Sequence, residues 1–146
     1  MQNTESNNRL NTTWWALRVL FGFVPIAAGL DKFFNLLTNW EAYLNPLATK
    51  LIPVSAATFM HIVGVIEIAA GIAVVSRFTK IGAYVVTLWL VAIALNLLVM
   101  GKFLDVAVRD LGLSVAAFSL AQMTAVREEG TSPVRFVNSH PVPARS

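Results

Sequence analysis

A glutamate interrupts the apolar segment of the chain that runs from Thr58 to Val75. If this segment is a membrane-spanning helix that begins at Thr58 on the outer side, Glu67 lies nine residues, or about 13 Å, below that end. A carboxylate near the middle of a bilayer costs about 3 kcal/mol or more, so it requires a proton or a cationic partner. Glu67 is therefore the first candidate for chemistry in this sequence.

Ionisable and polar residues near the ends of the other apolar segments could form one pocket with Glu67. Lys32 or Arg109 could reach down to the carboxylate from the outer side, and Arg18 could reach up to it from the cytoplasmic side. Such a pocket would contain the hydrogen-bond donors and the proton route that a quinone site needs. The predicted ligand or pocket residues are Glu67, His61, Lys32, Arg109, Asp110, Asn96 and Arg18.

Each of these residues also has a structural interpretation. Arg18 and Lys32 could be anchors whose charged ends extend to the membrane surface, and Asp110 could cap the fourth helix, where a carboxylate favours the N-terminal dipole. Asn96 could hydrogen-bond between helices, and the central glutamate could be a protonated carboxyl that joins two helices. We expect His61 to be a hydrogen-bonding residue and predict no metal site, with a haem held by His61 and a methionine as an open alternative.

Glycines on the first two apolar segments share helical faces with these charged residues. At 100° per residue, Arg18 and Lys32 lie on one face with two glycines between them, and Glu67 shares a face with a glycine on either side of it. Aligned glycines allow two helix backbones to approach closely, so we expect Glu67 at a helix contact rather than facing lipid. The predicted packing glycines are Gly22, Gly29, Gly64 and Gly71.

The composition of the 146-residue chain indicates a membrane protein. Hydrophobic residues make up 56% of it and charged residues 13%, about half the charged fraction of soluble domains. The absence of cysteine excludes disulfides, thiol redox motifs and cysteine-ligated zinc, iron–sulfur or c-type haem sites. The net charge of +3 arises from basic residues scattered singly over loops and tails, so we do not expect nucleic acid as a partner.

Four apolar segments predict an all-α fold, an integral membrane four-helix bundle. A signal-peptide core at 19–28 is the alternative for the first segment. The predicted divisions are an N-terminal cytoplasmic tail without regular structure (1–13), a domain (14–126) with spans at about 14–34, 58–75, 81–100 and 103–126, and a disordered cytoplasmic C-terminal tail (127–146).

The connections between these spans differ in length. Five residues, SRFTK, join the second and third spans, so we expect those helices to be an antiparallel pair. The first connection is long and predicts a short amphipathic segment that lies on the outer surface of the membrane or caps the mouth of the bundle. The residues at helical spacing in this segment are Trp40, Tyr43, Leu44, Leu47 and Leu51.

The distribution of basic residues predicts the orientation in the membrane. Seven basic residues lie on the side that carries both tails and the SRFTK turn, and four lie on the other side. The positive-inside rule then places both termini in the cytoplasm. We therefore expect a multi-pass protein of the cytoplasmic (inner) membrane of a bacterium.

The motifs LRVLFGFVPIAAGLDKF, GVIEIAAGIAVVSRFTK and VRDLGLSVAAFSLA resemble those of the DoxX-like family of small four-helix membrane proteins, over roughly residues 14–124. The resemblance implies a four-span bundle. For some members it implies the role of small membrane subunit of thiosulfate:quinone oxidoreductase, and for others an association with oxidative-stress or sulfur-redox complexes. The positions that match are Arg18, Gly22, Gly29, Lys32, Gly64, Glu67, Gly71, Arg109 and Asp110.

The expected function is that of a membrane subunit or scaffold in a quinone-linked redox or oxidative-stress complex. Quinone could be the ligand, no cofactor is expected in the chain itself, and a partner would supply any redox cofactor, because the sequence lacks a dinucleotide motif and a thiol. Candidate partners are the lipid bilayer, a soluble or membrane redox protein and further copies of the chain. The alternatives are a small proton-coupled transporter or exporter and a purely structural partner of another membrane protein.

Overall fold

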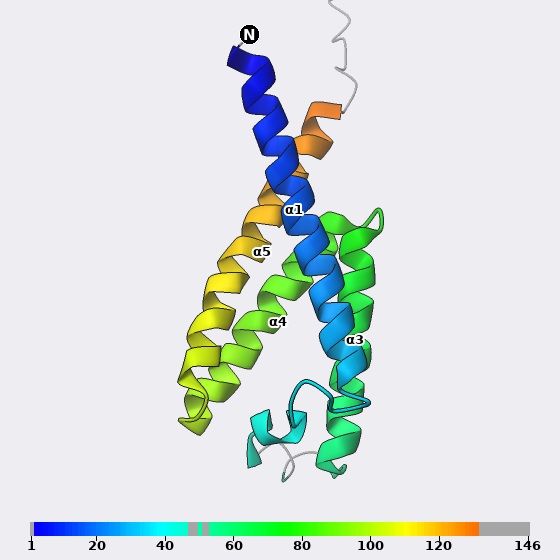
Figure 1. Ribbon diagram of the computed structural model, residues 1–146, viewed down its shortest axis with the longest axis vertical. Helices are drawn as coiled ribbons and strands as arrows, with labels where there is room; N and C mark the ends of the chain where they lie inside the picture. Colours follow the sequence, from blue (N-terminus) through cyan, green and yellow to red (C-terminus); the bar gives the residue numbers. More distant parts are fainter. Residues whose placement is uncertain (1, 47–49, 51–52, 132–146) are drawn as a thin grey trace, which may run out of the picture.

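The computed structural model describes residues 2–46, 50 and 53–131, which contain four long α-helices and a short 3₁₀ helix (Figure 1). The prediction of an all-α fold is confirmed for this part of the chain. Three helical segments within it are long and apolar enough to cross a membrane, in α1, α3 and α4. In chain order the elements are α1 (Gln2–Asp31), η1 (Trp40–Tyr43), α3 (Ala56–Val75), α4 (Thr79–Met100) and α5 (Leu104–Thr131).

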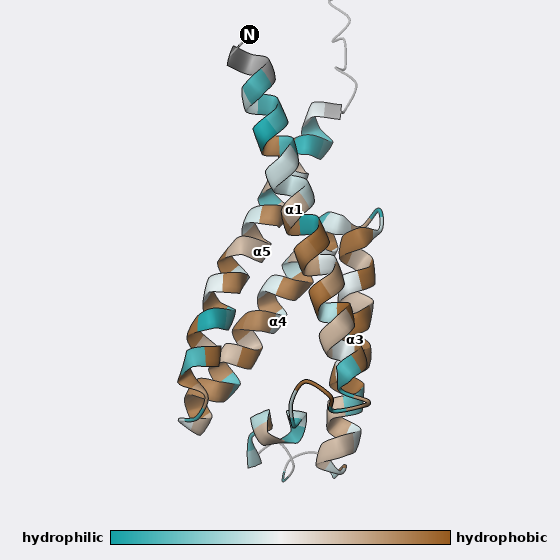
Figure 2. Cartoon of the chain, in the orientation of Figure 1, coloured by the Kyte–Doolittle hydropathy of each residue, from teal (hydrophilic) through white to brown (hydrophobic). Residues whose placement is uncertain are grey.

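Hydrophobic residues predominate along most of the length of the helices, whereas polar residues gather at the N-terminal part of α1 (Figure 2). Phe23 in α1, Val65 in α3 and Leu88 in α4 are 63%, 58% and 71% exposed. Apolar surface of this extent is unusual on a water-soluble monomer. It supports the interpretation that lipid surrounds the helices.

The N-terminal region differs from the prediction. The sequence predicts an irregular tail over residues 1–13, but α1 begins at Gln2. Extending an existing helix adds one hydrogen bond for each residue that is fixed, so a polar segment can continue a helix that would not form alone. The hydroxyl groups of Thr12 and Thr13 also donate to backbone carbonyls four residues earlier, both at 3.0 Å.

The C-terminal end of α5 likewise extends past the predicted end at residue 126. The helix continues to Thr131, and Arg127 Nη1 donates to Asn11 Oδ1 in α1 at 2.8 Å. The two helices therefore remain in contact beyond their apolar parts. Residues 132–146 of the predicted C-terminal tail lie outside the described residues.

The first helix ends at Asp31, three residues before the predicted end at residue 34. The carboxylate of Asp31 accepts the backbone N–H groups of Leu36 and Leu37 at 3.0 and 3.1 Å, and the indole N–H of Trp40 at 2.7 Å. These bonds close the chain into a turn, where Asn35 has a φ of 53°. The carboxylate thus ends the helix and directs the chain back over the bundle.

The helices pack as two close pairs, α1 with α3 and α4 with α5, and α4 follows α3 through the SRFTK turn (Figure 1). The four glycines predicted for packing lie between α1 and α3. A Cβ atom on Gly29 would lie 2.5 Å from the carbonyl oxygen of Gly64, and one on Gly64 would lie 2.6 Å from that of Gly29. A Cβ on Gly71 would lie 2.5 Å from the carbonyl oxygen of Gly22. Side chains at these positions would push the two backbones apart.

One hydrophobic cluster joins all four helices at the end of the bundle that contains the α3–α4 turn. The indole N–H of Trp14, within this cluster, donates to the hydroxyl of Thr124 at 2.8 Å and so links α1 to α5. The cluster closes this end of the helix pairs, and the polar residues considered below lie toward the other end. Its buried members are Trp14, Phe21, Ala70, Val74, Ala83, Val86, Ala117, Leu120 and Ala121.

Candidate functional site

Glu67 and Lys32 form an ion pair inside the bundle. Lys32 Nζ lies 2.6 Å from Glu67 Oε2, and the two side chains are 8% and 4% exposed for the glutamate and the lysine. Taking both charges out of solvent costs several kcal/mol per ion before their attraction offsets it. Lys32, Arg109 and Arg18 are the three predicted cationic partners of Glu67, and the structure shows that Lys32 is the one that pairs with it.

The close approach of the helix backbones brings these two side chains together. Side chains on an α-helix lean toward its N-terminus, and α1 and α3 are antiparallel, so Lys32 leans toward Gly29 and Glu67 leans toward Gly64. A Cβ on Gly64 would lie 3.3 Å from the Cβ of Lys32, and one on Gly29 would lie 3.2 Å from the Cβ of Glu67. The two side chains thus approach the same glycine contact from opposite directions.

Tryptophans from two other elements complete the surroundings of the ion pair. Lys32 Nζ lies 3.6 Å from the centroid of the Trp40 ring, a cation–π contact whose energy rises when the cation is desolvated. The indole of Trp40 is held in turn by Asp31, as described above. The indole N–H of Trp89 in α4 donates to Glu67 Oε1 at 3.4 Å. Both carboxylate oxygens of Glu67 therefore have a donor.

Helix α5 contributes a second buried carboxylate. Asp110 is 3% exposed, and its Oδ1 accepts a hydrogen bond from Nε of Arg109 at 3.0 Å and lies 2.9 Å from Nη2 of the same ion-paired guanidinium. The Arg109 side chain itself is 63% exposed. Arg109 thus neutralises Asp110 and does not reach Glu67.

The 3₁₀ helix η1 lies across this end of the bundle and bridges the two helix pairs. The ring of Tyr43 stacks on Phe103, which precedes α5, with centroids 4.3 Å apart and planes 24° apart. The carbonyl oxygen of Tyr43 accepts a hydrogen bond from Asn96 in α4 at 2.8 Å. The described part of the amphipathic segment therefore covers the mouth of the bundle, while Leu47 and Leu51 lie outside the described residues.

Two predicted pocket residues lie elsewhere. His61 is exposed, and its ring stacks on Phe33 with centroids 4.8 Å apart and planes 9° apart. It is six residues from Glu67 in one helix, which corresponds to about 120° around the axis, so it faces away from the ion pair. Arg18 lies at the opposite end of the bundle and donates to the carbonyl oxygens of Val75 and Ser76 at 2.8 and 2.7 Å.

Sequence reasoning did not identify the tryptophans as parts of the site. Trp89 lies in a charge-free apolar segment, where an aromatic residue is most simply explained by packing or by lipid contact. Trp40 is predicted only as an apolar position of the amphipathic segment. The available signal was that an indole N–H inside an apolar helix requires an acceptor, and Glu67 is an acceptor of the right kind.

The geometry brings together one ammonium group, two carboxyl groups and several aromatic rings from the turn that follows α1, from η1, and from α3, α4 and α5. An ammonium group has three N–H donors, of which Lys32 directs one to Glu67, so a ligand carbonyl could accept another. Glu67 and Asp110 could hold or release protons. Among the described residues, no group of three or more His, Cys, Asp or Glu side chains is placed to hold a metal ion.

Comparison of the chain with family models, with curated proteins and with solved structures finds no match. The resemblance to the DoxX-like family therefore stays a prediction.

Proposed function

We propose that the chain is a four-span protein of the cytoplasmic membrane that binds a quinone, or a similar small amphipathic carbonyl compound, at the Lys32–Glu67 pair. In this role it is a membrane subunit of a redox complex, in line with the resemblance to DoxX-like proteins. The observation that carries the proposal is the position of the Lys32 ammonium, buried between a carboxylate at 2.6 Å and an indole ring at 3.6 Å.

The energetics of the ion pair favour a functional role over a purely structural one. A buried ion pair can usually be replaced by well-packed apolar side chains without loss of stability, and ionisable residues inside membrane-spanning helices mark functional sites by default. The α1–α3 contact already has its glycine packing, which holds the helices without any charge. Lys32 and Glu67 are therefore better explained by what they bind.

The residues around the pair match the chemistry of a quinone. The ammonium of Lys32 can donate to a quinone carbonyl, Glu67 can exchange a proton, and the rings of Trp40 and Trp89 present flat apolar faces to a ligand ring. Because the indole of Trp40 covers Lys32, a ligand would reach the ammonium by displacing η1. We infer that η1 is the movable part of the site.

A second function is favoured by the burial of two carboxyl groups, those of Glu67 and Asp110, which are 6% and 3% exposed. Buried acids can take up and release protons, as a proton-coupled transporter requires. In this alternative the substrate would be a cation that competes with Lys32 or with protons for the carboxylates. Uptake of a radiolabelled cation into proteoliposomes with an imposed proton gradient would distinguish this function from quinone binding.

The proposed orientation follows from the placement of the two ends of the helical domain. The start of α1 and the end of α5 lie at the same end of the molecule (Figure 1). An even number of spans requires this arrangement. The excess of basic residues on that side, seven against four, supports a cytoplasmic location for both ends.

The test is direct binding of decylubiquinone to the purified protein in lipid nanodiscs, with the retained quinone quantified after separation. We expect saturable binding that weakens at least tenfold in Lys32→Gln, a change that leaves Glu67 free to take up a proton. The matched control is Lys80→Gln, because Lys80 forms an exposed ion pair with Glu128 at 3.4 Å. Absence of saturable binding, or an equal loss in both variants, would refute the quinone site. Co-purification of another membrane protein in its place would favour the structural alternative.

A further inference from the structure

The chain turns back after α1 at the end of the molecule that η1 covers (Figure 1). The two charged residues at the start of this turn, Asp31 and Lys32, are only 7% and 4% exposed. The large apolar side chains that follow are exposed instead, with Phe34, Leu36 and Leu37 at 69%, 82% and 73%. The turn therefore buries its charges and exposes its hydrophobic residues.

This polarity is the reverse of that of a loop in water. Burial of a leucine or phenylalanine side chain is favourable, whereas burial of a charge is costly unless the charge is paired and hydrogen-bonded. Asp31 and Lys32 meet this condition through the bonds described above. The exposed apolar side chains have no such explanation in water, and a contiguous apolar patch on a surface marks a site of interaction.

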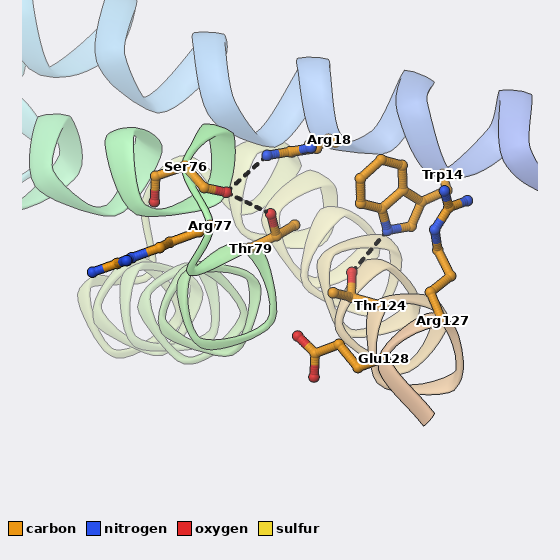
Figure 3. Close-up of a pocket in the computed structure, with 8 residues that line it drawn as sticks. All are labelled: Trp14, Arg18, Ser76, Arg77, Thr79, Thr124, Arg127 and Glu128. Atoms are coloured by element: carbon orange, nitrogen blue, oxygen red, sulfur yellow. Dashed lines mark hydrogen bonds between the residues drawn. The ribbon is translucent and has the colours of Figure 1, made fainter. Parts of the chain in front are cut away.

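The turn between α3 and α4, at the other end of the bundle, has the ordinary polarity. Arg77 in this turn is exposed, and its side chain extends away from Arg18 and Arg127 (Figure 3). The side chain of Lys80, three residues later, is 40% exposed. A turn at the border between membrane and water is expected to expose its charges in this way. The turn after α1 does not follow this pattern.

The backbone of the turn after α1 is also suited to an environment without water. The six N–H groups from Lys32 to Leu37 all have acceptors within the turn or the end of α1. The first two donate to carbonyl oxygens of the last helical turn at 3.2 and 3.1 Å, and the next two donate to the carbonyl oxygen of Asp31 at 2.9 and 2.7 Å. The last two donate to the carboxylate of Asp31. Backbone N–H groups in the core of a bilayer require such internal acceptors.

The apolar surface of the turn continues the surface of α1 that we interpret as facing lipid. Leu30, in the last helical turn of α1, is exposed. Phe33, also exposed, stacks on His61 near the start of α3. The exposed leucines of the turn follow directly after these residues in the chain. Lipid that covers α1 would therefore also reach the turn.

We propose that the turn formed by residues 33–37 inserts into the hydrocarbon of the outer leaflet, where Phe34, Leu36 and Leu37 contact lipid acyl chains. Helix α1 then ends within the membrane, and the Lys32–Glu67 pair lies below the border between lipid and water. This placement deepens the function proposed above, and for its consequence it rests on that function: a quinone dissolved in the bilayer meets the pair at its own depth.

The experiment measures the depth of the turn by electron paramagnetic resonance of a nitroxide spin label in dioleoylphosphatidylcholine vesicles. Because the chain contains no cysteine, Leu36→Cys or Leu37→Cys provides a single labelling site. The matched control is Lys102→Cys, which is exposed in the turn between α4 and α5 at the same end of the bundle. Power saturation compares collisions of each label with oxygen, which dissolves in hydrocarbon, and with nickel(II) ethylenediaminediacetate, which stays in water. We expect the ratio of oxygen to nickel collisions to be about threefold or more higher at the two leucine positions than at Lys102.

Two results would overturn the proposal. Equal ratios at the leucine positions and at Lys102 would mean that the turn lies in water. Few collisions with either reagent at the leucine positions would mean that protein, such as a second copy of the chain, covers the turn in place of lipid.

The labelled side chains are exposed, so the fold should be retained. Phe34→Cys tests the same prediction at a third position if one of the leucine variants fails to fold. The measurement is made without quinone, so its outcome is independent of quinone binding. A chain that binds no decylubiquinone can still show a lipid-exposed turn, and a turn in water would leave the binding test of the Lys32–Glu67 pair unchanged.

Discussion

Replacing Glu67 with glutamine should lower the free energy of unfolding by about 3–5 kcal/mol, because it leaves the charge of Lys32 buried without a partner. The magnitude follows from the burial of the pair, whose side chains are 4% and 8% exposed at a separation of 2.6 Å.

The assay is reversible unfolding in micelles, with the free energy obtained by steric trapping for four proteins: the wild type, Glu67→Gln, Lys32→Met and the double variant. Once the charge of Lys32 is gone, the glutamine no longer faces an unpaired ammonium and can still accept from Trp89. We therefore expect the double variant to be at least 2 kcal/mol more stable than the sum of the single losses predicts, as an order-of-magnitude coupling. Glu128→Gln, which disrupts an exposed pair with side chains 40% and 52% exposed, should cost only about 0–1 kcal/mol.

Two results would refute this reasoning. Additive losses in the cycle would mean that Lys32 and Glu67 do not interact in the folded protein. A loss in Glu67→Gln no larger than that in Glu128→Gln would mean that the ammonium of Lys32 reaches solvent. In either case the closed geometry beneath Trp40 would not describe the protein in a membrane.

Three further predictions concern packing, the cover of the site and topology. Gly29→Ala should cost about 1–3 kcal/mol of unfolding free energy because the added Cβ would lie 2.5 Å from a carbonyl oxygen of α3. The control Gly112→Ala, which has open space around it, should be neutral or stabilising by up to about 1 kcal/mol. Equal melting temperatures of the two variants in detergent would contradict the close backbone contact. Trp40→Phe keeps an aromatic ring over the ammonium of Lys32 but removes the hydrogen bond from the indole N–H to the carboxylate of Asp31. The same unfolding measurement should therefore show a loss of about 1.5–3 kcal/mol. An unchanged stability would show that this bond does not hold η1. Reporter domains fused after Ser76 and after Arg127 should both report a cytoplasmic location, and disagreement between them would exclude the four-span topology.

The presence of four long helices could be predicted from the sequence more reliably than the residues at which they begin and end. Runs of apolar residues of spanning length have few alternatives to a helix in a membrane, so four long helices were predictable. The end of α1 depended on the side chain of Asp31, which accepts hydrogen bonds from residues five and six positions later. Such a bond depends on how the chain folds back over the bundle after Asp31, and no sequence motif predicts it.

The composition of the site was less predictable for a related reason. The depth of a residue in the membrane can be estimated by counting from the end of an apolar segment. This estimate predicted that Glu67 and Lys32 lie in one pocket, but it wrongly placed His61 in the same pocket. Whether two side chains touch also depends on the direction in which each one points around its helix axis. The useful direction is set by which face of the helix the neighbouring helix covers. The glycines on α1 and α3 marked those faces. On α4 the comparable marker is Gly82, seven residues before Trp89, where an added Cβ would lie 2.6 Å from the backbone nitrogen of Val74 in α3, and the sequence interpretation did not use it.

The ion pair joins residues that are 35 positions apart in the chain, which has a consequence for how the protein is made. If the helices insert as they are synthesised, at about 5–20 residues per second, the lysine precedes its glutamate by about 2–7 s. During this interval α1 can keep the ammonium of Lys32 at the membrane surface, because the lysine lies just beyond the end of the helix and its long side chain can extend outward. Trp40, which later covers Lys32, also emerges before α3. When α3 is inserted, Glu67 would pair with Lys32. This pairing would draw α1 to its final depth in the membrane and bring the indole of Trp40 over the ion pair.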